Sequence, residues 1–211
     1  MAVLPKSLLW RRLDVVGADN ALLDDHRGLH ARGVAVAVDP IAYTCRYELV
    51  TDDSWAVSRL EVVAEGAGWL RNVRLERAAG RWRVTTAEQG DLDKALVSAG
   101  HVPAGLPGTE DPELLADAVD VDVSACPLFN TLPVRRLGLA RAEPGGEHPI
   151  TVAWVLVPSL EVLPAEQVYT ALGPEAVRFS SDGFTADLTL DPDGYVIHYP
   201  GLADRRADRT P

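Results

Sequence analysis

Hydrophobic and polar residues alternate with a period of two along the first part of the chain. The segment 43–49 is the clearest case, with aromatic or apolar side chains at every odd position and polar ones between them. This alternation is typical of a strand with one buried face. The same pattern, interrupted by turn residues, predicts strands at about 8–14, 21–26, 33–38, 43–49, 55–64, 69–77 and 81–85.

Strand patterns return in the last third of the chain. Residues 150–157 are apolar on both faces and predict a fully buried strand. Further strands are predicted at 167–172, 177–180, 184–190 and 195–199, with a hairpin turn at 191–194. About a dozen strands in this arrangement predict a mainly β fold, either a barrel or a large curved antiparallel sheet.

The stretch 119–139 joins these two parts and predicts a strand followed by a helix. Valine occupies positions 119, 121 and 123, so Asp120 and Asp122 share the opposite face of a strand. After a break at Pro127, Asn130 or Thr131 can cap a helix over 130–139, which we expect to fill the concave side of the sheet.

Two interpretations of the polar groups in this stretch stay open. Aspartates on a strand and the arginine pair Arg135 and Arg136 on a helix are often just solvated surface. Alternatively, the strand and the helix together line a polar pocket.

Residues 86–118 interrupt the strand pattern. Glycine, proline and acidic residues dominate this segment, so we expect a mobile acidic insertion at about 88–115, with a short helix at 112–118. We expect residues 1–203 to form a single domain and the charged end, 204–211, to be a disordered tail.

Composition and charge narrow the classes of function. The 211 residues carry a net charge of −11, and residues 88–120 hold eight acidic residues against one lysine, which argues against a nucleic-acid partner. No apolar run is long enough to cross a membrane, and the first residues do not form a signal peptide, so we expect a cytoplasmic protein. Cys45 and Cys126 are expected to be buried thiols, and no spacing indicates a metal or cofactor site.

Five motifs, in order along almost the whole chain, resemble a bacterial family first catalogued as a domain of unknown function and then named for glycolipid binding. They are WRRLD (10–14), Tyr47 with Asp53-x-Trp55, DVDVSACPLFNTLPVRRL (120–137), VAWVLVPSL with EQVYTAL (152–172), and DPDGYVIHYPGL (191–202). The chain departs from the family pattern in the long acidic segment 88–118 and at Ala118, where glycine is expected.

The resemblance implies an antiparallel half-barrel wrapped around one helix, similar to the carriers that move lipoproteins across the periplasm. It also implies a homodimer and an acidic pocket, which Asp120 and Asp122 match by position. Aromatic residues such as Tyr169 and Trp154 can stack on sugars or pack acyl chains. The predicted ligand-binding residues are Asp120, Asp122, Asn130, Arg135, Arg136, Gln167, Tyr169, Tyr47 and Glu48.

Three hypotheses about function follow. The first is a non-catalytic binding protein for a glycolipid-like amphiphile, with a role in glycolipid or cell-envelope metabolism. The second is a carbohydrate-active enzyme that uses Asp120 or Asp122 as acid or base, and the third is a dimeric scaffold without a ligand. The absence of a nucleophile–base pair favours binding, whereas a raised pKa on one aspartate would favour the enzyme.

Overall fold

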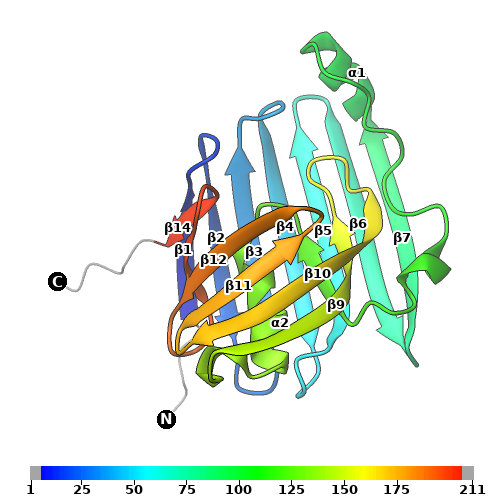
Figure 1. The fold of residues 1–211 in the computed structure, drawn as a ribbon. Coiled ribbons are helices and arrows are strands. Elements are labelled where there is room, and N and C mark those ends of the chain that lie inside the picture. The colour runs from blue at the N-terminus through cyan, green and yellow to red at the C-terminus, as the bar shows by residue number, and fades with distance from the viewer. Residues whose placement is uncertain (1–5, 206–211) are drawn as a thin grey trace.

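The computed structural model describes residues 6–205 and contains one curved, open sheet of fourteen strands (Figure 1). Along the sheet the order is β7-β6-β5-β4-β3-β2-β1-β14-β13-β12-β11-β10-β9-β8. The strands are β1 (Lys6–Arg12), β2 (Gly17–Asp24), β3 (His30–Ala37), β4 (Tyr43–Thr51), β5 (Val57–Gly66), β6 (Trp69–Ala78), β7 (Arg81–Gly90), β8 (Asp120–Val123), β9 (Gly145–Val155), β10 (Val162–Gly173), β11 (Ala176–Ser181), β12 (Phe184–Leu190), β13 (Val196–Tyr199) and β14 (Ala203–Arg205). The predicted mainly β fold is confirmed.

Two antiparallel meanders make up the sheet, and β14 joins them by pairing with β1. Figure 1 shows β9–β12 crossing in front of the strands of the first meander, which gives the sheet its concave side. The expectation of a purely antiparallel sheet is wrong for one pair, since β8 pairs with β9 in parallel. Parallel neighbours need a crossover connection, and here helical turns supply it.

The expected helix over 130–139 is divided into shorter pieces: η2 (Pro127–Asn130), α2 (Thr131–Arg136) and η3 (Leu139–Arg141). Gly138, with a φ of 70°, separates α2 from η3. Asn130 does not act as a side-chain cap, because its own backbone is already helical.

The helical turns η2 and α2 are packed between the two meanders. The Phe129 ring meets Tyr47 of β4 edge-on, with 5.2 Å between ring centroids. On the other side, the Asn130 side chain donates to the hydroxyl of Tyr169 on β10. Leu128 and Leu132 are fully buried, so these turns form part of the main hydrophobic core.

The segment 88–115 contains two helices, α1 (Leu92–Ser98), which the sequence pattern did not predict, and η1 (Pro112–Leu115). Leu92 and Leu96 of α1 are buried, and Asp91 caps the helix by accepting from the backbone N–H of Lys94. The expected helix at 112–118 is confirmed as the shorter η1. The mobility of the insertion stays a prediction.

At the C-terminal end the predicted boundary needs a small correction. Asp204 and Arg205 continue β14, because their backbones pair with β1. The rest of the predicted tail, 206–211, lies outside the described residues. Between residues 6 and 205, no helix is long and apolar enough to cross a membrane.

Candidate functional site

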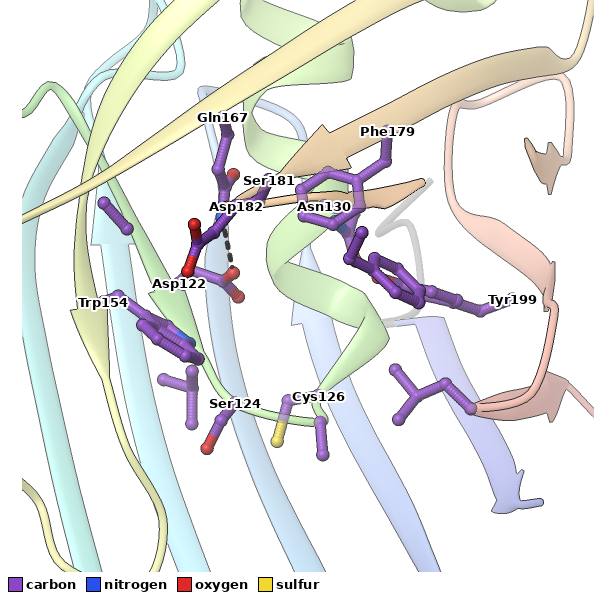
Figure 2. Close-up of a pocket in the computed structure, with 15 residues that line it drawn as sticks. Asp122, Ser124, Cys126, Asn130, Trp154, Gln167, Phe179, Ser181, Asp182 and Tyr199 are labelled. Carbon is purple, nitrogen blue, oxygen red and sulfur yellow. Dashed lines mark hydrogen bonds between the residues drawn. The ribbon is translucent and has the colours of Figure 1, made fainter. Parts of the chain in front are cut away.

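A cavity of about 380 Å³ lies between β8, the η2 turn and the second meander (Figure 2). Its polar side is formed by Asp122, Asn130, Gln167, Ser181 and Asp182. The remaining lining residues are Val123, Ser124, Ala125, Cys126, Trp154, Ala165, Phe179, Phe184, Tyr199 and Leu202. The cavity therefore joins a polar end to a mainly apolar remainder.

A directed chain of hydrogen bonds links η2 to β8 across one side of the cavity. The Asn130 Nδ2 donates to the Tyr169 hydroxyl at 2.9 Å, and that hydroxyl donates to Oε1 of Gln167 at 3.3 Å. The Gln167 Nε2 then donates to Oδ2 of Asp122 at 2.8 Å, as Figure 2 shows. Gln167 and Tyr169 both reach this chain because they lie two residues apart on the same face of β10.

Burial governs the electrostatics of Asp122. Loss of water around the carboxylate raises its pKa to about 6, while the hydrogen bonds from Gln167 and from the backbone of Val123 act in the opposite direction. Among the described residues, no lysine, arginine or histidine forms an ion pair with Asp122. When Asp122 ionises, therefore, no cationic side chain is paired with its carboxylate.

Asp120 lies on the same strand but outside the cavity. It is fully buried, and the Arg136 Nε donates to its Oδ1 and Oδ2 at 3.1 and 3.2 Å. Burial raises the Asp120 pKa even though Arg136 lowers it. Because the last turn of α2 covers Asp120 with Arg136, the predicted two-aspartate pocket contains only Asp122.

Besides Asp120 and Arg136, three more of the predicted site residues lie away from the cavity. Arg135 stacks over Trp55, with its guanidinium 4.3 Å from the ring centroid. Tyr47 packs under the η2 turn and donates to Oδ1 of Asp19 at 3.2 Å. Glu48 points to the opposite face of β4 and forms an ion pair with Arg59.

The remaining predicted residues gather at the cavity. Asn130 and Gln167 line it, and Tyr169 lies directly behind them in the hydrogen-bond chain. Cys126, one of the two cysteines, also lines it, and both cysteines are buried free thiols as predicted. Within residues 6–205, no group of three His, Cys, Asp or Glu side chains is placed to hold a metal ion.

Several residues that line the cavity were not among the predicted site residues. Asp182 belongs to the two-residue Asp182-Gly183 turn between β11 and β12 and has a φ of 42°. An Asp-Gly pair between two strands is a strong hairpin signal, and the predicted strands at 177–180 and 184–190 already implied a turn between them. The sequence carried no signal that this hairpin, with Phe179 and Phe184, lines the same cavity as β8.

Comparison with known proteins gives one family and one similar fold. Residues 7–205 match the family described as "Putative glycolipid-binding". No curated protein matches the chain. The crystal structure of a DUF1089 family protein from Pseudomonas aeruginosa is similar, with a TM-score of 0.66 and 24% sequence identity over 89% of this chain and 92% of that chain.

At this identity the structural likeness shows the fold alone, and the similarity to lipoprotein carriers stays a prediction. The family match extends over nearly the whole described structure and includes β8, η2, β9 and β10, which contribute residues to the cavity. It also confirms the resemblance inferred from the five motifs. The chain therefore belongs to the family described as "Putative glycolipid-binding".

Proposed function

We propose that this protein is a non-catalytic binding protein for a glycolipid-like amphiphile. The observation that carries the proposal is the cavity, in which a polar end built on Asp122 continues into an apolar remainder. Its volume of about 380 Å³ is at the lower end of the range for small-molecule sites, ~300–1,000 Å³. The head group and the first part of a tail fit this volume, and the rest of a long tail extends through the mouth.

The hydroxylated head group is assigned to the polar end. Gln167 holds one oxygen of Asp122, which leaves the other oxygen to accept from a ligand hydroxyl. Trp154 lines the cavity beside Asp122, and its indole can pack against the apolar face of a sugar ring. Sugar binding generally combines such carboxylate and amide contacts with an aromatic surface.

The tail is assigned to the aromatic side of the cavity. Figure 2 shows Phe179 and Tyr199 side by side across the cavity from Trp154, and Phe184 and Leu202 also line it. Phe184 is 50% exposed, so an apolar side chain stands at the cavity mouth. Covering Phe184 with an acyl or alkyl chain removes apolar surface from water, which favours binding.

Isothermal titration calorimetry with octyl glucoside, below its micelle-forming concentration, tests the proposal. We expect measurable binding that weakens at least several-fold in Gln167→Leu, because that variant removes the group that orients Asp122. Glu48→Gln, on the opposite face of β4, serves as the control and should bind as the wild type does. Equal binding by all three proteins would place the ligand elsewhere.

The enzyme hypothesis retains one supporting observation. The Asp122 pKa of about 6 is raised, as a general acid requires. However, Asp120 is held by Arg136 outside the cavity, so these two aspartates do not face one substrate. Release of nitrophenol from aryl glycosides that is lost in Asp122→Asn would favour the enzyme over the binding protein.

The wider role also belongs to this proposal. We place the protein in glycolipid or cell-envelope metabolism, in the cytoplasm and as a homodimer. The family match supports the ligand class, and the net charge of −11 is consistent with a small-molecule ligand rather than a nucleic acid.

A further inference from the structure

The charged side chains that line the cavity are all acidic. Asp122 of β8 is half-buried, and Asp182 lies in the exposed β11–β12 turn. Among the residues described, no lysine, arginine or histidine lines the cavity. A ligand in this space therefore meets negative charge without a protein cation to balance it.

The nearest arginines on the helical crossover are already engaged elsewhere. Arg136 binds Asp120 through three donor–acceptor contacts. Arg135 stacks on Trp55 and donates to the backbone carbonyl of Asp193 at 2.6 Å. Neither guanidinium is free to neutralise Asp122 or to bind an anionic head group.

The direction of the hydrogen-bond chain adds to this effect. Every donor in the chain points towards Asp122, which is the final acceptor. The donors that line the rest of the cavity, such as the indole N–H of Trp154, are neutral. Neutral donors suit sugar hydroxyls, but they do not offset the charge of a phosphate or a carboxylate.

We infer that the cavity selects an amphiphile whose head group carries a protonated amine, such as an amino-sugar glycoside, and rejects anionic head groups. This inference rests on the proposed function and adds the charge of the ligand to it. An ammonium group donates to Asp122 a hydrogen bond in which donor and acceptor are both charged, whereas a sugar hydroxyl donates to the same carboxylate as a neutral group. We therefore expect about a tenfold preference for the amine over the matched neutral sugar.

Three probes with the same eight-carbon tail test the inference by calorimetry at about pH 7, where an amine of this kind is largely protonated. They are octyl glucoside, the corresponding octyl 2-amino-2-deoxyglucoside, and octyl glucuronide. We expect the amine to bind about tenfold more tightly than the glucoside, and the glucuronide at least about tenfold more weakly. A glucuronide that binds as tightly as the glucoside, or an amine that binds no better, would overturn the inference.

Variants assign the selectivity to the two carboxylates. Asp122→Asn should reduce the preference for the amine to about one, and Asp182→Asn should reduce it by a smaller factor, because Asp182 is exposed and screened by solvent. Asparagine tolerates the positive φ of position 182, so this second variant is expected to fold. Glu48→Gln makes the same change in net charge outside the cavity and should keep the full preference.

An amine preference that survives in the double variant Asp122→Asn, Asp182→Asn would also overturn the inference. The proposed function fails separately, if none of the three probes binds the wild type. Binding of the glucoside without selection by charge would contradict only the inference about the amine.

Discussion

The substitution Asp122→Asn isolates the free-energy cost of a carboxylate that is partly withdrawn from water. Burial raises the pKa of Asp122 from 3.8 to about 6, so the folded protein binds this proton more tightly than the unfolded chain does. An acid with a raised pKa stabilises the folded state least when it is ionised. The free energy of unfolding should therefore decrease as the pH rises through about 4 to 6, owing to this group.

The size of the effect follows from the two pKa values. A shift from 3.8 to about 6 corresponds to roughly 3 kcal/mol once both states are ionised, at 1.36 kcal/mol for each pH unit. At about pH 4.5 only about 1 kcal/mol of this cost is present, because the folded state still holds its proton. Asparagine does not titrate, so the variant avoids the cost at every pH.

Urea denaturation at about pH 4.5 and pH 7.5 measures the difference between wild type and Asp122→Asn. We expect the variant to gain about 2 kcal/mol relative to the wild type between these two pH values. A pH-independent effect of the new amide on Gln167 cancels when the difference between the two proteins is compared at the two pH values. The contributions of the other titrating groups cancel as well, because both proteins contain them. Asp182→Asn, in the exposed turn, should show little change at either pH.

A pH-independent difference between the two proteins would refute this reasoning. It would mean that Asp122 is in contact with bulk water and that the cavity does not withdraw its carboxylate from solvent. Combined with unchanged ligand binding, that result would remove Asp122 from the site.

Three further predictions concern the framework around the site. Leu132→Ala should lower the free energy of unfolding, measured by urea denaturation, by about 2–5 kcal/mol, because Leu132 is fully buried in the main core. Leu137→Ala should lower it less, because Leu137 is only half-buried, and equally small losses in both variants would place α2 at the surface. Arg136→Gln should lower the free energy of unfolding by about 3–5 kcal/mol, because it leaves the buried Asp120 without its ion-pair partner. Adding Asp120→Asn should restore much of this stability, and Arg178→Gln, which breaks an exposed ion pair, is the control. Limited proteolysis should cut first between 99 and 110, where Val102 and Leu106 are both 81% exposed, and first cuts elsewhere would contradict the predicted mobility.

The alternation of side chains predicted most of the sheet. A period of two appears in the sequence wherever one face of a strand is buried, which holds for β3, β4 and β6. The short β14 has no such pattern, since its three residues are held mainly by backbone pairing with β1 and β13. The parallel pairing of β8 was equally hidden, because periodicity does not encode strand direction.

Helix α1 escaped prediction although its signals were present. Asp91 is a capping residue, and Leu92 and Leu96 have the spacing of one helical face. The surrounding glycine, proline and acidic residues outweighed these signals. The helix forms because its two leucines find apolar partners in the main core, which is a tertiary effect.

At the candidate site, too, tertiary contacts that sequence patterns do not encode determine the outcome. Asp120 and Asp122 have identical periodicity, so sequence reasoning treated them as a pair. Their different environments arise from Arg136, which reaches only Asp120 from the end of α2. Of the predicted site residues, Asn130 and Gln167 line the cavity with Asp122, whereas the position of Asp182 depends on where a distant hairpin folds back.

Mapping of octyl glucoside by NMR chemical shifts tests the central claim most directly. With amide resonances assigned, titration below the micelle-forming concentration should shift the signals of Asp122, Trp154, Gln167 and Phe184 in concert. Asp122→Asn should reduce those shifts at the same concentration of ligand. Shifts that gather instead on the opposite face of the sheet, around Val34 and Glu48, would contradict the cavity as the binding site, and so would undiminished shifts in the variant.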